Sequence, residues 1–206
     1  VTGTEDNNKQ VLTREEFIEK VASEILHTKT DIMKSVTIAQ AILESNWGQS
    51  YLAQSANNLF GIKASEDWKG NYLEAKTKEQ DKNGKETTIL AKFRKYDSYK
   101  DSILDHDKFF TSTAWRTKNY KRVLEANSYE EQTKALQDCG YATDVCYADK
   151  LMNVIEQYNL QRFDKVEEVQ SEKVYRNMYI LGEKVKAVSV ENGVSGLWLE
   201  KSKVYV

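Results

Sequence analysis

Apolar residues recur every three or four positions through most of the chain, which is the spacing of one face of an α-helix. Thr13 and Glu16 form a capping-box signature that marks the start of the first predicted helix. A second predicted helix spans about residues 31–45 and stops at Asn46. The pattern predicts further helical segments within residues 50–63, after Ser98, and over residues 117–126, 128–138 and 146–158.

Two stretches depart from the helical spacing. Residues 72–80 and 86–95 predict two strands, and the Asn83-Gly84 pair between them is a strong signal for a β-hairpin. Residues 166–206 hold short Val- and Tyr-rich runs broken by glycines, which indicate a linker followed by β-structure. The chain therefore combines a helical body with two separate regions of β-structure.

We accordingly expect an α+β fold that is mainly α and has three parts. Residues 1–12 form a flexible lead-in, residues 13–163 a helical domain with a small β-hairpin lobe, and residues 164–206 a linker with a partial β-rich segment. Segments of about 40 residues without disulfides or metals rarely fold alone. The last part therefore either packs on the main domain or is a fragment of a larger module.

Composition narrows the class of protein. The chain has 206 residues, of which 40% are hydrophobic, and a formal net charge of -2. These values allow a domain with a real core and offer no clustered positive field for a nucleic acid. No apolar run approaches the roughly 20 residues that span a bilayer, and the polar opening at Val1 is compatible with a secretory signal removed upstream. His27 and His106 are predicted at surface or helix-end positions, so we expect no metal site.

Glu44 is the residue whose setting points to chemistry. It is the carboxylate at the end of an otherwise apolar predicted helix, and both the helix C-terminus and apolar neighbours disfavour its charged form. Both effects raise the pKa of a carboxyl, which suits a general acid at neutral pH. Trp47 follows and offers a flat surface for a sugar ring. The alternative is a solvated glutamate in a frayed last turn, and these residues alone do not decide between the two.

Several ordered motifs carry a resemblance to a known family. They are AILESNWGQS at residues 41–50, SANNLFGIK at 55–63, AKFRKYDS at 91–98, GYATD at 140–144 and YADKL at 147–151. Together they resemble the mannosyl-glycoprotein endo-β-N-acetylglucosaminidase-like domain of bacterial autolysins, glycoside hydrolase family 73, over about residues 13–163. The resemblance implies a lysozyme-like fold.

The resemblance also implies two carboxylates. Glu44 matches the family's catalytic acid, and Glu79 matches a second carboxylate on a mobile hairpin. Glu74 and Glu86 are rivals on the same hairpin. A two-residue turn at the hairpin tip would place Glu79 opposite Thr88, but the sequence does not decide which face of the hairpin meets the cleft.

Tyr147 matches a tyrosine that the family keeps near the acid, where it would orient the substrate or stabilise positive charge. A helix aromatic packed in the core is the alternative. The substrate-binding residues expected from the motifs are Trp47, Asn57, Asn58, Phe60 and Tyr141.

One stretch departs from the family pattern. The family usually has proline after Thr-Asp, where this chain has Val145 and then Cys146. Cys139 and Cys146 bracket the loop that bears Tyr141, so they either form a disulfide in an oxidising setting or remain two inert side chains in a reducing one. Near the end, Gly196-Leu197-Trp198 resembles the start of a GW-type, SH3-like wall-binding module.

The resemblance implies hydrolysis of the N-acetylglucosaminyl-β-1,4-N-acetylmuramyl bond, with peptidoglycan glycan strands as partner and no metal or cofactor. It further implies a secreted monomer at the wall or surface of a bacterium, with a Gram-positive source favoured. Two alternatives remain. One is a muramidase or lytic transglycosylase that uses Glu44 alone, and the other is a wall-binding protein without activity.

Overall fold

A computed structural model describes residues 12–26, 28–80 and 86–165 and the strands beyond them, with the backbone alone described for residues 78–80 and for those strands. The chain divides into two compact units, Val1–Lys165 and Val166–Val206. The predicted lead-in, apart from Leu12, and the hairpin tip with Asn83-Gly84 lie outside the described residues.

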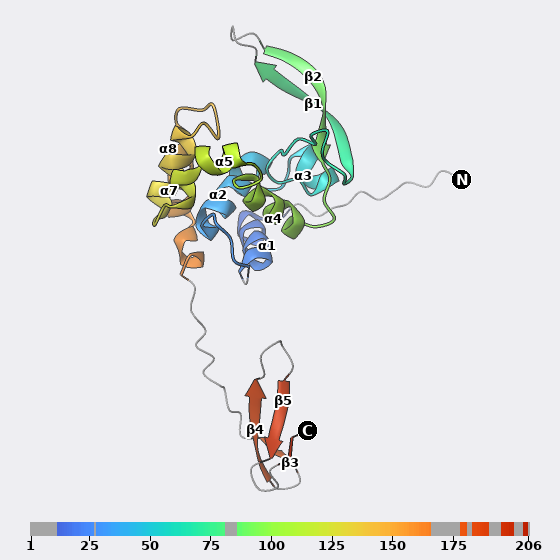
Figure 1. Cartoon of the computed structure of the whole chain (residues 1–206), viewed down its shortest axis with the longest axis vertical. Coiled ribbons are helices and arrows are strands. Elements are labelled where there is room, and N and C mark those ends of the chain that lie inside the picture. Colours follow the sequence, from blue (N-terminus) through green and yellow to red (C-terminus); the bar gives the residue numbers. More distant parts are fainter. Residues whose placement is uncertain are drawn as a thin grey trace, which may run out of the picture. The chain divides into compact units, whose positions relative to one another are not determined.

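The described part of the first unit is mainly helical (Figure 1). Its helices are α1 (Arg14–Ile25), α2 (Lys34–Ser45), α3 (Tyr51–Ala56), α4 (Tyr99–Phe109), α5 (Ala114–Asn119), α6 (Lys121–Leu124), α7 (Tyr129–Asp138), α8 (Tyr147–Gln157) and the 3-10 helix η1 (Leu160–Phe163). The predicted capping box is confirmed, because Thr13 accepts from the Glu16 amide while the Glu16 carboxylate accepts from the Thr13 amide.

Helix α2 is the centre of this unit. Nearly all of its residues are buried, and it contacts α1, α7, α8 and η1. Its N-cap, Met33, makes no side-chain cap hydrogen bond. Side chains from distant elements satisfy the amides there instead, since Gln132 accepts from the Met33 amide and Asp164 accepts from the Ser35 amide. Distant parts of the fold therefore cap the N-terminus of α2.

One predicted helix is wrong. Residues 117–126 were expected to form a single helix, but α5 and α6 meet at Tyr120, whose φ of -93° and ψ of 15° interrupt the helical path. The ring of Tyr120 is buried against Phe109 and Phe110. Burying this aromatic side chain outweighs the continuation of one short helix, because only tertiary packing stabilises helices of this length.

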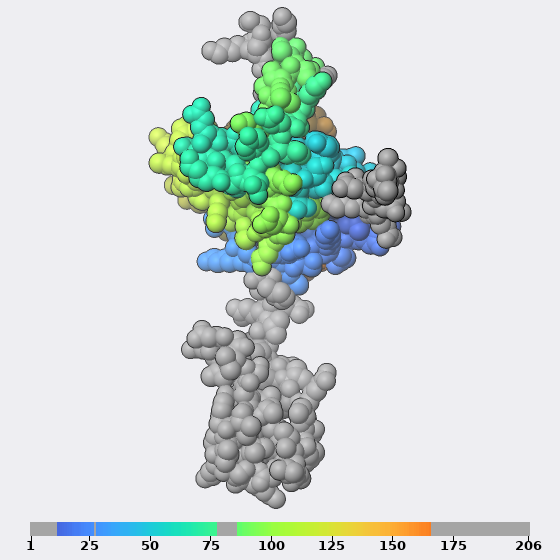
Figure 2. All heavy atoms as spheres, turned by 90° about the vertical axis from the view of Figure 1, so that its right-hand side faces the viewer, coloured from blue at the N-terminus to red at the C-terminus, as the bar shows by residue number. Residues whose placement is uncertain are grey.

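Strands β1 (Tyr72–Gln80) and β2 (Glu86–Arg94) form the predicted antiparallel hairpin. It projects from the helical body in both views (Figures 1 and 2). The register runs from Tyr72 opposite Arg94 to Gln80 opposite Glu86, which leaves five residues, 81–85, between the last paired positions. A two-residue turn requires an even number, so the predicted pairing of Glu79 with Thr88 is wrong, and Glu79 lies opposite Thr87.

The two faces of the hairpin differ in exposure. Along β1, Leu73, Ala75 and Thr77 are partly buried, whereas the alternating positions Glu74 and Lys76 are exposed. The partners of the less exposed set include the buried Phe93, which anchors that face to the helical body. Backbone alternation therefore separates two sets of positions, and the less exposed set is the one that faces the protein near the hairpin base.

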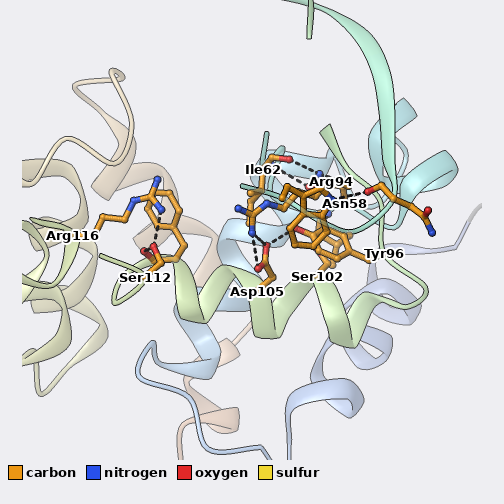
Figure 3. A network of polar contacts seen from close by, with 12 residues as sticks. Asn58, Ile62, Arg94, Tyr96, Ser102, Asp105, Ser112 and Arg116 are labelled. Atoms are coloured by element: carbon orange, nitrogen blue, oxygen red, sulfur yellow. Dashed lines mark hydrogen bonds and ion pairs between the residues drawn. The ribbon is translucent and has the colours of Figure 1, made fainter. Parts of the chain in front are cut away.

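A polar network holds the base of the hairpin on α4 (Figure 3). Nη1 of Arg94 lies 2.7 Å from both carboxylate oxygens of Asp105, and the Tyr96 hydroxyl donates to Asp105 over 2.7 Å. The Arg94 guanidinium also stacks 4.4 Å from the ring centroid of Trp68. A planar guanidinium is suited to both contacts, so this cluster fixes where the hairpin leaves the body.

The second unit is a four-stranded antiparallel sheet in the order β3-β4-β5-β6. Its strands are β3 (Met178–Ile180), β4 (Glu183–Ser189), β5 (Ser195–Leu199) and β6 (Val204–Tyr205). The Gly196-Leu197-Trp198 motif lies within β5. The β-rich character predicted for this segment is thus confirmed, with each strand paired to its neighbour in sequence.

Candidate active site

Glu44 lies in the last turn of α2, immediately before an unusual change of chain direction. Asn46, Trp47 and Gly48 follow with φ values of 48°, 60° and 71°, all in the left-handed region. Ser45 stabilises this turn, since its hydroxyl donates to the Ala41 carbonyl and accepts from the Gly48 amide. The stop signal predicted at Asn46 is confirmed, and the turn leaves Glu44 exposed at the end of a buried helix.

Tyr147 lies beside Glu44, as the resemblance implied. Its hydroxyl donates to Oε1 of Glu44 over 2.9 Å. The amide nitrogen of Gln40 in turn donates to the Tyr147 hydroxyl over 3.1 Å. Gln40 is 0% exposed and Tyr147 is 5% exposed, so both polar groups lie inside the protein. The three side chains form a directed chain of hydrogen bonds from the interior to the carboxylate.

The pKa of the Glu44 carboxyl lies above its usual value. Partial burial against the protein is the main cause, and the hydrogen bond from Tyr147 offsets part of the rise. The residue is nevertheless exposed as a whole, so its side chain can be reached from solvent although its carboxyl is partly enclosed. Burial also raises the pKa of the Tyr147 hydroxyl, which keeps it a neutral donor. An accessible carboxyl with a raised pKa has the properties of a general acid.

A second layer of rings supports Tyr147. Tyr141 stacks on it at a centroid distance of 5.8 Å, and the Tyr141 hydroxyl lies 3.1 Å from Nε2 of His106. His106 is buried and stacks on Phe60 at 3.9 Å. Burial lowers the pKa of His106 to about 3, so the ring is neutral. Tyr141 and Phe60 therefore both belong to the packing behind the site.

Three of the predicted substrate-binding residues make structural contacts within the protein. Asn58 is 1% exposed, and its side chain is bonded to the backbone of Ile62 and Arg94 (Figure 3). Phe60 is buried under His106, so neither residue lines a surface. Asn57 is the left-handed C-cap of α3, and its amide donates to the carbonyls of residues 96 and 97. Asparagine tolerates this backbone region, which explains its presence at position 57.

Trp47 also makes structural contacts within the protein. Its ring meets Phe17 and Tyr158 edge to face, at centroid distances of 6.2 and 5.0 Å. The guanidinium of Arg14 lies over the ring at 5.1 Å. The left-handed turn after Glu44 directs this side chain toward α1 and the end of α8. Trp47 therefore packs against the core below the turn while staying partly exposed, and the sugar-stacking role stays a prediction.

Of the two alternatives for Cys139 and Cys146, the structure has the unbonded one, because both are free thiols. Cys139 is the C-cap of α7 and packs partly against the core, whereas Cys146 is the exposed N-cap of α8. The two thiols lie at the ends of different helices and in different environments. The loop between them is held instead by Asp144, which accepts from the Cys146 amide and pairs with Lys150.

Glu79 is located by its register alone. Its position has the strand parity of Leu73, Ala75 and Thr77, whereas Glu74 lies on the exposed alternate face. Glu86 pairs with Gln80 and so falls in the same alternate set as Glu74. Backbone alternation thus separates Glu79 from both of its rivals.

Two residues near the site were missed by the sequence. Gln40 precedes Glu44 by one helical turn and therefore shares its helix face, so a polar residue in an apolar run was an available signal. His106 was expected at the surface or a helix end; it lies in the last turn of α4, but it is buried. No local sequence signal pairs it with Tyr141, since the two are 35 positions apart.

The described residues offer neither a metal site nor a membrane-spanning helix. Among the described side chains, no group of three His, Cys, Asp or Glu residues is placed to hold a metal ion. Within the same described part of the chain, no helix combines the length and the apolarity needed to cross a membrane.

Comparison with known proteins places this geometry in a family. The family described as mannosyl-glycoprotein endo-beta-N-acetylglucosaminidase matches residues 20–160. The chain belongs to this glucosaminidase family. Both the hairpin and the hydrogen-bonded pair of Glu44 and Tyr147 fall within the matched range.

Relatives of this glucosaminidase domain agree with the assignment. The exo-glucosaminidase LytG of Bacillus subtilis is 48% identical over 153 residues, which cover 73% of this chain and 53% of LytG. The peptidoglycan hydrolase FlgJ of Escherichia coli is 40% identical over 139 residues, which cover 66% of this chain and 43% of FlgJ. The chain thus spans about half the length of the curated relatives it matches.

A solved structure supports the fold directly. The catalytic domain of the autolysin Auto from Listeria monocytogenes superposes with a TM-score of 0.66 and 36% identity, over 80% of this chain and 99% of that domain. The expected mainly helical fold with a small β-hairpin lobe is therefore confirmed. The glucosaminidase domain belongs among the glycoside hydrolases.

Proposed function

We propose that this chain is a peptidoglycan hydrolase that cuts the N-acetylglucosaminyl-β-1,4-N-acetylmuramyl bond within bacterial glycan strands. The observation that carries the proposal is the pair formed by Glu44 and Tyr147. Glu44 is exposed, the pKa of its carboxyl is raised, and Oε1 accepts a hydrogen bond from a buried hydroxyl. The name of the relative FlgJ supports peptidoglycan as the substrate.

The chemistry begins with Glu44. Its proton passes to the glycosidic oxygen as the bond to the anomeric carbon breaks, which avoids expelling an alkoxide. The sugar passes through an oxocarbenium-like transition state, and water then adds to the anomeric carbon. The products are two glycan fragments, one of which has a new N-acetylglucosamine reducing end.

We assign the second carboxylate to Glu79. It either activates the attacking water, which gives inversion, or assists while the acetamido group of the substrate attacks first. Register supports Glu79 over Glu74 and Glu86, because it alone of the three shares strand parity with Leu73 on the less exposed face. Glu79→Gln should therefore lose activity, while the matched variants Glu74→Gln and Glu86→Gln on the alternate face keep it. An equal loss in all three variants would contradict the assignment.

Reducing-end analysis of digested peptidoglycan tests the bond that is cut. New N-acetylglucosamine reducing ends are expected. Muramic ends would instead indicate a muramidase, and anhydromuramic ends a lytic transglycosylase. The lengths of the products test endo cleavage, which shortens long strands from within. Release of short fragments from strand ends would indicate an exo enzyme, the activity named for LytG.

Glu44→Gln separates an enzyme from a wall-binding protein. The variant keeps the size and the hydrogen-bond acceptor of Glu44 but has no proton to give. Loss of cell-wall clearing with retained binding to insoluble peptidoglycan supports the proposal. Equal clearing by wild type and variant would overturn it.

The setting of the activity follows from its substrate. We propose a secreted monomer that acts at the wall or surface of a Gram-positive bacterium, with the segment from residue 164 to residue 206 serving as a linker and partial wall-binding region. Cell fractionation and sedimentation of the purified chain test the location and the oligomeric state. Loss of wall binding on removal of residues 166–206 would support the role of the segment.

A further inference from the structure

Gln40 takes no part in the chemistry described so far, yet it is the innermost member of the chain that ends on Glu44. It lies one helical turn before Glu44 in α2 and is 0% exposed. Its amide nitrogen is 3.1 Å from the Tyr147 hydroxyl oxygen, which itself donates to Oε1 of Glu44 over 2.9 Å. A buried glutamine in an apolar helix costs free energy unless its amide hydrogen-bonds.

The direction of these hydrogen bonds follows from the inventory of protons. A tyrosine hydroxyl carries one proton, and its oxygen can also accept. The Gln40 N–H group points at that oxygen, so the hydroxyl proton is left to donate to Glu44. The reversed amide would place Oε1 of Gln40, which is otherwise buried without a hydrogen-bond partner, against Tyr147 and would draw the hydroxyl proton inward, away from Glu44. A hydrogen bond from the Tyr147 hydroxyl to an ionised Glu44 carboxylate is stronger than one to the neutral amide oxygen of Gln40. This difference favours the direction in which Gln40 donates to Tyr147 and Tyr147 donates to Glu44.

This direction matters most when Glu44 is protonated. Its proton occupies one of two oxygens. While Tyr147 donates to Oε1, that oxygen acts as an acceptor, and the acidic proton remains on Oε2. If the Tyr147 oxygen were free to accept, Glu44 could instead donate its proton inward, where no substrate can take it. A general acid transfers its proton only from an oxygen that reaches the leaving group.

We propose that Gln40 is a positioning residue that fixes the direction of the hydrogen bond from Tyr147 to Glu44 and thereby keeps the proton of Glu44 on the oxygen available to the substrate. The inference rests on the general-acid role proposed for Glu44. It adds a residue that touches neither the substrate nor the reacting atoms and acts through Tyr147.

The surroundings of Glu44 make the inference testable by pH. Among the described side chains, the titratable groups placed around it are Tyr147 of α8 and Tyr141 of the loop before α8. Burial raises the pKa of both hydroxyls, and His106 behind Tyr141 stays neutral because burial lowers its pKa to about 3. A basic limb of the kcat profile above the ordinary pKa of glutamate would therefore report Glu44.

The test measures kcat against pH for Gln40→Met, on soluble glycan fragments of peptidoglycan. Methionine is close in size to glutamine but has no N–H donor. We expect kcat to fall roughly fivefold to tenfold with little change in KM, the scale of one hydrogen bond. The basic limb should move to higher pH, because protonated Glu44 gains a bond to the freed Tyr147 oxygen and so holds its proton longer.

Gln132→Met is the matched control. Gln132 is also a buried glutamine, and its side chain bonds the Val123 carbonyl and the Met33 amide, away from Tyr147. It should lower thermal stability without moving the basic limb. If Gln40→Met likewise leaves the limb in place, and kcat per folded molecule is unchanged, Gln40 is only structural and the inference is overturned.

A double-mutant cycle with Tyr147→Phe gives a second test. Tyr147→Phe alone should lower kcat and raise the basic limb, since it removes the bond that lowers the pKa of Glu44. In that background Gln40→Met should have no further effect on kcat, because its partner is gone. If the losses in kcat of the two single variants multiply in the double variant, the inference is overturned. It is also overturned if the basic limb of Tyr147→Phe does not move, and this second outcome can be measured even if Gln40→Met fails to fold.

Failure of the inference differs from failure of the proposed function. If Glu44→Gln keeps wild-type activity, the general-acid role itself is wrong. If Glu44→Gln is inactive while the limb of Gln40→Met stays in place, only the role of Gln40 is wrong.

Discussion

The hydroxyl of Tyr147 reaches Oε1 of Glu44 over 2.9 Å, although 103 positions separate the two residues. This hydrogen bond and the burial of the carboxyl shift the pKa of Glu44 in opposite directions. Burial of the carboxyl raises the pKa of Glu44, and the hydrogen bond lowers it by a smaller amount. Tyr147 thus restrains the rise in pKa while fixing which oxygen of Glu44 serves as acceptor.

Glu44→Gln should be more thermally stable than the wild type at neutral pH. The pKa of Glu44 is higher in the folded protein than in the unfolded chain, so the folded state binds more protons between the two values. The free energy of unfolding of the wild type therefore falls as pH rises through this window. Glutamine removes that loss, and we expect a gain of up to a few degrees in Tm at pH 8.

The gain should vanish at about pH 4, below the usual pKa of glutamate. Differential scanning fluorimetry across this range measures it. Glu66→Gln, at an exposed loop position, controls for the loss of one negative charge. A gain in Tm that is the same at pH 4 and pH 8 would show that the titration of Glu44 is not its source.

Arg94→Lys should destabilise the chain by about 2 kcal/mol, because it breaks a partly buried bidentate pair. A single nitrogen, Nη1, contacts both Asp105 oxygens, but an ammonium has no planar group to stack on Trp68 while it does so. Urea denaturation measures the change in the free energy of unfolding. Glu125→Gln is the comparison, since it breaks the exposed Lys121–Glu125 pair at a cost below about 0.5 kcal/mol. Similar costs for the two variants would contradict the anchoring role of Arg94.

Local signals were enough to predict several elements of the fold. The capping box at Thr13 and Glu16 marks α1 because both of its hydrogen bonds form within one turn. The change from helical to alternating spacing locates the hairpin because it can be read directly from the order of residues along the chain. Glu44 was identified from its neighbours in sequence together with the family motifs.

Features that depend on distant residues could not be predicted. Gln40 and Tyr147 are 107 positions apart, so no periodicity links them. The direction of the Trp47 side chain depends on three consecutive residues in the left-handed region. The Asn-Trp-Gly sequence allows this conformation but does not predict it. The pairing of Glu79 depends on how many residues the hairpin tip contains, and a difference of one changes every partner.

Both cysteines should react as free thiols in the native protein. The exposed Cys146 should be alkylated faster than Cys139, whose pKa is raised mainly by burial, because the thiolate is the reactive form. Mass spectrometry of a time course with iodoacetamide gives the two rates. In denaturant the rates should converge. A pair that labels only after reduction would instead indicate a disulfide.

Gly48→Ala should destabilise the chain strongly, by about 3 kcal/mol, because it adds a clash to backbone strain. Gly48 has a φ of 71°, and a Cβ there would lie 2.6 Å from Cε2 of Phe17. Gly61 has a similar φ of 62° with no atom within 4 Å of its Cβ position. Gly61→Ala should therefore cost only the strain, about 1 kcal/mol. Urea denaturation of both variants separates the clash from the strain.

The clash between a Cβ at position 48 and the Phe17 ring predicts that substitutions at these two positions have non-additive effects on stability. Phe17 is fully buried, so Phe17→Leu costs stability by itself through lost packing. It also removes the ring atoms that a Cβ at position 48 would meet. The double variant Gly48→Ala with Phe17→Leu should then lose less stability than the sum of the single losses, whereas Gly61→Ala with Phe17→Leu should be additive. Additivity in both pairs would mean that backbone strain alone requires glycine after the turn that exposes Glu44.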